Sequence, residues 1–208
     1  MTEQQLELPA IEVVTETAWI SGHLSRDQAS DAANLSSVLN LDEYGLRGRS
    51  MIESGRLVDV LNRDRAYITV CEARIQPFFP LQLLDRHVEQ VAVSTAEILC
   101  AAPLRPDTPT HGSVEPASTG AYAQPARERR TIELQIGPIL VSGDFHIVLG
   151  SDPVAAFFQR DLDFVPLTSA TVTYLPEPQR SWVREVLIVN KRRAQILMSA
   201  ASAEAAGP

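Results

Sequence analysis

An internal repeat constrains the fold of this chain more than any other feature of its sequence. Residues 60–75 (VLNRDRAYITVCEARI) align without a gap on residues 157–172 (FFQRDLDFVPLTSATV). The identical positions in the two copies are Arg63 and Arg160, Asp64 and Asp161, and Ala73 and Ala170. Both copies of a duplicated module need the same turns and the same core. The repeat therefore explains these residues by fold and argues against their forming a single catalytic centre.

Two flanking blocks extend the repeat in the same order. Upstream, residues 19–24 (WISGHL) resemble residues 140–145 (LVSGDF). Downstream, residues 91–100 (VAVSTAEILC) match residues 187–198 (LIVNKRRAQILM), where the second copy has two additional arginines. Three blocks in one order predict a tandem duplication rather than a chance similarity.

The residue patterns predict a mainly β fold. We expect each copy to be a small five-stranded module, a partly open barrel or a bent sheet, with one short helix. The expected helices lie at residues 57–62 and 154–159, and the expected strands are rich in aromatic and β-branched residues, at 11–24, 67–75, 88–93, 98–101, 164–174, 182–189 and 196–199. Gly22 suits a bend or bulge in a strand, and Pro166 indicates an edge strand or a bulge. Tyr67 and Phe164 occupy equivalent positions, which predicts a core role for both.

The same patterns predict three parts along the chain. The first module covers residues 11–102 and includes an insertion at 27–55, which has no counterpart of that length in the second copy. Residues 103–130 contain five prolines among small and polar residues, which is typical of an extended linker. The second module covers residues 131–199. Within the insertion, residues 34–39 predict a short helix with Asn34 as its N-cap.

One short segment resembles a known type of module. Residues 56–62 read R-L-x-D-x-L-N and precede a strand that begins with an aromatic residue. This run resembles small bacterial β-barrel modules of Sm-like shape, and the second copy departs from it with Phe157, Phe158 and Gln159. The resemblance implies a tandem pair of small barrels and carries no activity with it.

Charge and composition narrow the range of partners. The net charge of −8 argues against a polyanionic partner such as nucleic acid. The basic clusters at 127–130 and 191–193 are interpreted as a linker end and a hairpin turn. No signal peptide and no membrane-length apolar run is visible, so cytoplasmic residence and no membrane insertion are expected. Two cysteines, Cys71 and Cys100, are too few for a disulfide framework and are expected to be free, buried thiols.

Motifs that carry chemistry are missing from the sequence. It contains no phosphate-binding loop, no H-E-x-x-H, no C-x-x-C and no nucleophile elbow, and it implies no cofactor. His23 aligns with Asp144, and His146 lies two residues further on. These three residues form a conceivable metal or ligand site if the modules face each other. Polar residues at the ends of strands are the simpler interpretation, and no metal is expected.

Three hypotheses for function follow. The first is a non-enzymatic assembly or adaptor protein, whose two pseudo-symmetric β-modules bind another protein or a second copy through exposed strand edges. The alternative is a regulatory module that holds a small polar or anionic ligand between the copies, with the insertion as a lid. An enzyme with a dispersed site at His23, Asp144 and His146 is the third and least favoured.

Overall fold

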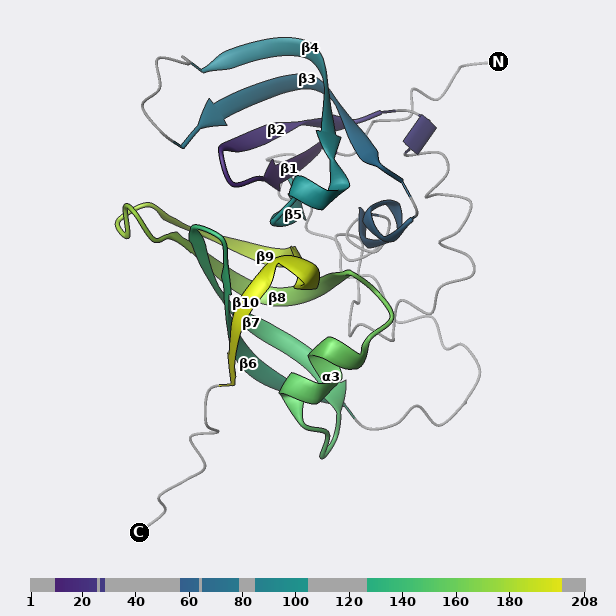
Figure 1. Cartoon of the computed structure of the whole chain (residues 1–208), viewed down its shortest axis with the longest axis vertical. Helices are drawn as coiled ribbons and strands as arrows, with labels where there is room; N and C mark the ends of the chain where they lie inside the picture. The colour runs from purple at the N-terminus through teal and green to yellow at the C-terminus, as the bar shows by residue number, and fades with distance from the viewer. Residues whose placement is uncertain are drawn as a thin grey trace, which may run out of the picture.

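The computed structural model describes residues 10–25, 27–28, 57–63, 65–78, 85–104 and 127–199 (Figure 1). The first half of the chain contributes five strands: β1 (Ala10–Val14), β2 (Ala18–Leu24), β3 (Tyr67–Pro77), β4 (Arg86–Ser94) and β5 (Cys100–Pro103). The second half contributes β6 (Arg127–Ile136), β7 (Ile139–Val148), β8 (Phe164–Tyr174), β9 (Ser181–Asn190) and β10 (Ala194–Ser199). The expectation of a mainly β protein is confirmed.

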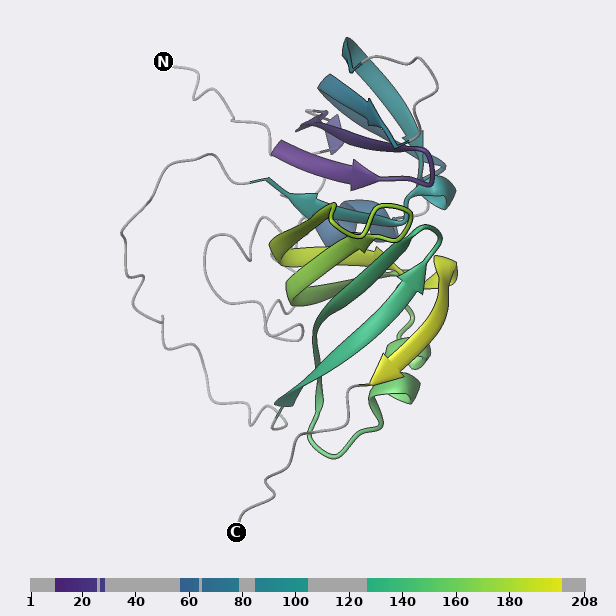
Figure 2. The ribbon, with the colours of Figure 1, turned by 90° about the vertical axis from the view of Figure 1, so that its left-hand side faces the viewer.

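All ten strands belong to one open antiparallel sheet. Their order is β10-β6-β7-β8-β9-β5-β1-β2-β3-β4. The first-half strands lie together at one end of the molecule and the second-half strands at the other (Figures 1 and 2). Within each half the strands follow the same order, since β5-β1-β2-β3-β4 corresponds to β10-β6-β7-β8-β9. The halves meet where β5 pairs with β9.

Helical segments lie where the sequence predicts them. One covers residues 57–62, and the other is α3 (Pro153–Gln159). The Asp152 side chain accepts hydrogen bonds from the amides of Val154 and Ala155, and Pro153 occupies the first turn, so both a cap and a preset φ start the helix. Short 3-10 turns, η2 (Thr95–Glu97) and η3 (Lys191–Arg193), connect the last two strands of each half.

Both halves bend at a glycine. The β2·β3 register shifts between Ser21 and His23, and the β7·β8 register shifts between Ser142 and Asp144. Gly22 and Gly143 lie at these shifts, which confirms the expected bulge at Gly22. On the partner strands, Glu72 and Ser169 have positive φ values of 49° and 50°. These two residues are aligned in the sequence repeat, so the two halves deviate from regular strand geometry at matching positions.

The expected surroundings of Pro166 and of residues 127–130 were wrong. Pro166 does not lie on an edge strand, because β8 lies between β7 and β9. The β7·β8 pairing ends at Thr168, so Pro166 lies beyond it, where the missing N–H costs no bond to β7.

The basic cluster at 127–130 is not a linker end, because β6 begins at Arg127 and pairs with β7 from its first residue. Most of the expected insertion and linker, at residues 29–56 and 105–126, lies outside the described residues.

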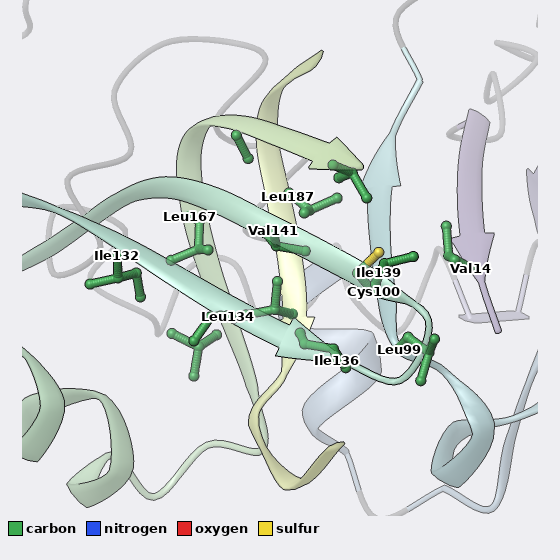
Figure 3. Packing of buried hydrophobic residues seen from close by; sticks show 14 of the residues in the cluster. Val14, Leu99, Cys100, Ile132, Leu134, Ile136, Ile139, Val141, Leu167 and Leu187 are labelled. Carbon is green, nitrogen blue, oxygen red and sulfur yellow. The ribbon is translucent and has the colours of Figure 1, made fainter. Parts of the chain in front are cut away.

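The buried side chains form two clusters that both cross the junction. Leu99, Cys100 and Ala102 of the first half pack with the apolar side chains of β6 to β9 (Figure 3). Phe164 and Ile188 of the second half pack instead with the first-half core. Successive residues of β5 and β9 point to opposite faces of the sheet, which lets one strand serve both clusters. Each of the two buried clusters therefore contains side chains from both halves of the chain.

The expected core role of Tyr67 was wrong. Its side chain is 55% exposed, whereas the aligned Phe164 is 3% exposed. Phe164 begins β8 and packs into the first-half cluster. Tyr67 begins β3, next to the end strand of the sheet. The two positions are equivalent in sequence but differ in what lies beside them.

Candidate assembly interface

The β5·β9 junction is the place where one half of the chain binds the other. Cys100 lies opposite Val189, and Ala101 lies opposite Ile188. The Asn190 amide extends the ladder by donating to the Leu99 carbonyl at 2.9 Å. The Asn190 side chain adds a bond from Nδ2 to the Ile98 carbonyl at 3.0 Å. A short strand pair is thus reinforced by an asparagine at its end.

A second asparagine connects the halves from the helical segment 57–62. Asn62 Nδ2 donates to the Phe164 carbonyl at 2.9 Å, and the Phe164 amide donates to Asn62 Oδ1 at 2.8 Å. The side-chain amide thereby pairs with the backbone of β8 as a neighbouring strand would. Two hydrogen bonds to one backbone position fix where β8 begins relative to the first half.

A buried ion pair lies on one side of the junction. Arg184 of β9 donates to both carboxylate oxygens of Glu12 on β1, at 2.5 and 2.6 Å. The Glu12 side chain is 1% exposed. Burial raises the pKa of Glu12, while Arg184 acts in the opposite direction. A bidentate guanidinium is the partner that a buried carboxylate needs to remain charged.

A stacked pair of indoles lies next to this ion pair, with Trp19 in contact with Arg184. Trp19 of β2 and Trp182 of β9 stack with their ring centroids 4.7 Å apart. The Arg184 guanidinium lies 5.7 Å from the Trp19 ring centroid, within the range of a cation–π contact. The ion pair therefore connects β9 to β1, and the aromatic contacts connect β9 to β2.

The ends of the sheet differ from this interior junction. β4 and β10 occupy the two ends of the strand order. The last five residues of β9 are buried, whereas the last five of β4, its counterpart in the repeat, are mostly exposed or half-buried. Edge strands of this kind present backbone N–H and C=O groups to which another strand can bind.

The residues of the predicted inter-module site lie in two separate places. His23 is in β2, with Nε2 4.0 Å from Glu72 Oε2. Asp144 and His146 are both in β7, which four strands separate from β2 in the sheet order. Asp144 Oδ1 accepts a hydrogen bond from Thr131 Oγ1, and the His146 Nε2 and Thr168 Oγ1 atoms are 3.0 Å apart.

Electrostatics at His146 favour the neutral ring. Burial lowers the pKa of His146, and Arg129 lowers it further, with Asp144 acting in the opposite direction. Neutral imidazole can bind a metal, but ligands must be close together. Across the part of the chain that the structure describes, no group of three His, Cys, Asp or Glu side chains is placed to hold a metal ion.

The residues that are identical in the two copies of the sequence repeat are characterised by their burial and contacts in the fold. Ala73 and Ala170 are fully buried beside the glycine bends. The Arg160 guanidinium lies 4.6 Å from the Phe145 ring centroid and donates to the His146 carbonyl. The remaining members are Arg63, which is half-buried near Asp59, Asp161, which is exposed, and Asp64, which lies outside the described residues. These surroundings agree with the interpretation of the repeat by fold.

The cysteines are both free thiols. Cys100 is fully buried, and Cys71 is half-buried, so the expectation of burial holds fully for Cys100 alone. Burial raises the pKa of the Cys100 thiol, and nearby Glu12 raises it further. Because the thiolate is the reactive form, this environment makes Cys100 a weak nucleophile.

Asp59 has an unusual environment in the helical segment 57–62. Its Oδ2 atom is buried without a hydrogen-bond partner, and burial raises its pKa to about 6, with Arg63 acting in the opposite direction. The folded state then binds a proton more tightly than the unfolded state, whose pKa is near 3.9. The contribution of Asp59 to stability therefore decreases as the pH rises from about 4 to about 6.

We expect Asp59→Asn to remove this pH dependence. Wild type should lose more free energy of unfolding than the variant between pH 4 and pH 7, as measured by urea denaturation at both values. Asp152→Asn is the matched control, because an exposed N-cap asparagine replaces aspartate with little cost. Parallel pH profiles for wild type and Asp59→Asn would contradict the prediction.

Several residues of this interface give little signal in the sequence. Glu12 lies in an alternating run where a solvent-facing carboxylate is the natural reading, and its partner is 172 positions away. Asn62 and Asn190 look like ordinary ends of a helix and a strand. The conservative pairing of Asn62 with Gln159 in the repeat is the one signal that could have indicated Asn62.

Comparison with known proteins does not change this description. The chain matches no protein-family model, no curated protein and no solved structure. Among the helices of the described residues, none has the length and apolarity needed to cross a membrane.

Proposed function

We propose that this chain is a non-enzymatic assembly protein, formed by tandem duplication of a five-stranded bent-sheet module, that binds partner strands along the edges of its sheet. The observation that carries the proposal is the β5·β9 junction. There, the edge of one half already binds the edge of the other within a single chain. The same two kinds of edge occur again at the ends of the sheet, as β10 and β4.

Three structural correspondences support the duplication. The strands of each half follow the same order. The glycine bends lie at aligned positions, opposite the aligned positive-φ residues Glu72 and Ser169. Each half also has one short helix before its third strand. These features are backbone geometry, which a chance similarity of side chains would not produce.

The composition of the end strands supports edge binding. β10 has no charged residue, and the last five residues of β4, QVAVS, have none either. Natural proteins commonly protect an edge strand with lysine, proline or an inward charge. The part of β4 nearest η2 lacks all three, as does β10. Such edges are typical of strands that pair with another chain.

Ala92→Pro tests the proposal directly. The Thr95 amide donates to the Ala66 carbonyl, so by alternation the amides of Val93 and Val91 face β3 and that of Ala92 faces outward. Proline at position 92 therefore removes an outward donor and leaves the β3·β4 ladder complete. We expect wild type to have a molar mass above the 22.8 kDa of one chain by light scattering, and Ala92→Pro to be monomeric.

The control is Ala92→Val, which keeps the amide and suits a strand. It should associate as wild type does, and circular dichroism should show all three proteins folded. Assembly with a different protein would appear as a monomeric wild type that captures a stoichiometric partner from lysate, lost in Ala92→Pro. A wild type that is monomeric at every concentration and captures no partner would overturn the proposal.

A further inference from the structure

We infer that copies of this chain assemble head to tail, with β10 of one copy pairing antiparallel with β4 of the next in the register of the β5·β9 junction. This inference rests on the proposed function and identifies its partner as a second copy. In the repeat, β10 is the counterpart of β5, and β4 is the counterpart of β9. The internal junction is therefore the template for the contact between chains.

The template gives an explicit register. Cys100 lies opposite Val189, and Ala101 lies opposite Ile188. The 3-10 turns η2 and η3 have equal length and end in matching bonds, from the Ile98 amide to the Thr95 carbonyl and from the Ala194 amide to the Lys191 carbonyl, so Cys100 corresponds to Ile196. The pairings of Cys100 with Val14 and of Ile196 with Gln135 give the same correspondence. The transferred pairs place Ile196 opposite Val93 and Leu197 opposite Ala92 of the next copy. The bond from the Asn190 amide to the Leu99 carbonyl becomes a bond from the Ser94 amide to the Gln195 carbonyl. The Ser94 amide faces outward, as this pairing requires.

Burial at the β4 end supports the inference. Phe164 is 3% exposed because it packs into the first-half core across the junction. Its counterpart Tyr67 is 55% exposed at the start of β3. Likewise, Ile188 is fully buried, whereas its counterpart Ala92 is exposed. A second copy next to β4 would cover Tyr67 and Ala92 as the first half covers Phe164 and Ile188.

At the opposite end of the molecule, α3 exposes apolar side chains whose counterparts in the first half are buried at the junction. Leu57 and Leu61 are each 2% exposed and belong to the cluster that receives Phe164. Their counterparts on α3, Val154 and Phe158, are 37% and 48% exposed. The exposed apolar side chains of α3 would thus receive Tyr67 of the next copy. Gln159 would face the Tyr67 backbone in the position that Asn62 takes at Phe164.

Several of the exposed large apolar side chains belong to these two surfaces. Seven large hydrophobic side chains are exposed in the described part of the chain, and three of them, Tyr67, Val154 and Phe158, are counterparts of residues buried at the junction. They lie at the two ends of the sheet rather than on one surface. The contact therefore joins unlike surfaces, and such a contact closes into a ring or grows into a filament.

Cysteine pairs test the register. In a hydrogen-bonded antiparallel pair the Cα atoms lie about 5.5 Å apart, which a disulfide spans. In a Cys71→Ser background, Ala92→Cys with Leu197→Cys should give a ladder of covalent dimers, trimers and larger species after mild oxidation. Ala92→Cys with Ile196→Cys is the matched control, because a shift of one residue places the side chains on opposite faces of the sheet.

The cross-linking outcomes separate the two proposals. A ladder specific to the 92/197 pair supports the head-to-tail contact. Equal cross-linking of the 92/196 pair, products that stop at dimers, or no product above the single-cysteine controls would overturn it. If these failures occur while Ala92→Pro still abolishes association, the proposal of assembly through the sheet edges is retained and the head-to-tail register is rejected.

A mixing experiment that needs no cysteine tests the same contact. Tyr67→Asp damages the β4 end, and Phe158→Asp damages the α3 end, at positions where the wild-type side chains are 55% and 48% exposed. Each variant alone should self-associate about tenfold more weakly or worse, since aromatic anchors dominate interfaces. An equimolar mixture retains one intact end of each kind and should form a 1:1 heterodimer by native mass spectrometry. Two variants that associate normally, or a mixture without heterodimer, would contradict the inference.

Discussion

Arg184→Met is expected to lower the free energy of unfolding by about 3–5 kcal/mol at pH 7. The side chain of Glu12 is 1% exposed, and both of its oxygens accept hydrogen bonds from Arg184. Methionine retains much of the apolar volume of arginine but supplies no donor. The carboxylate would then be buried as an uncompensated charge, which is the costly way to break such a pair.

The pH dependence of this loss identifies its cause. Burial already raises the pKa of Glu12, and removal of Arg184 takes away the interaction that opposes the rise. With a raised pKa in the folded state, protonation favours folding, so stability is lost as the pH rises through that pKa. The deficit of Arg184→Met should therefore be large at pH 7 and smaller near pH 4.5.

The control is the double variant Glu12→Gln/Arg184→Met. It removes the buried charge together with its partner and should recover much of the loss at pH 7. Urea denaturation of wild type and both variants at the two pH values measures the effect. A deficit in Arg184→Met that is the same at pH 4.5 and pH 7 would show that lost packing around Trp19, rather than the charge, causes it.

The ion pair also shows where sequence reasoning ends. Local patterns predict most elements correctly, because alternating apolar residues, helix starts and a glycine at a bend act over a few residues. The helical segment 57–62, α3 and the bulge at Gly22 are of this kind. The pairing of Glu12 with Arg184 depends on which strands become neighbours, and no spacing along the chain encodes that.

The repeat itself explains the largest error. An alignment gives equal status to Tyr67 and Phe164, and it predicts that both are buried. In the structure only Phe164 has the other half of the chain beside it, because β5 pairs with β9 while β4 ends the sheet. Aligned positions have different environments when one lies at the junction of the halves and the other lies at the end of the sheet. Differences in burial between aligned residues therefore locate surfaces that the single chain leaves uncovered.

Gly22→Ala is expected to lower the free energy of unfolding by about 3 kcal/mol, at the upper end of the usual cost of overpacking. A Cβ at position 22 would lie 2.5 Å from the Cys71 carbonyl oxygen and 2.7 Å from Val70 Cγ1. The carbonyl belongs to the β3 backbone, so it cannot move without shifting the strand. The two strands would have to separate at the bend where they are closest.

The aligned glycine provides the comparison. At Gly143 the added Cβ would lie 3.2 Å from the Cβ atoms of Leu167 and Ala170, contacts that shifts of a few tenths of an ångström relieve. Alanine also reduces the entropy of the unfolded chain, which offsets about 0.4–1 kcal/mol of the cost. Gly143→Ala should therefore remain within about 1 kcal/mol of wild type. Equal losses in the two variants, measured by urea denaturation, would mean that the bends are equivalent in tightness as well as in sequence. A larger loss at Gly22 would show that the first half holds its bend by a closer backbone contact than the second.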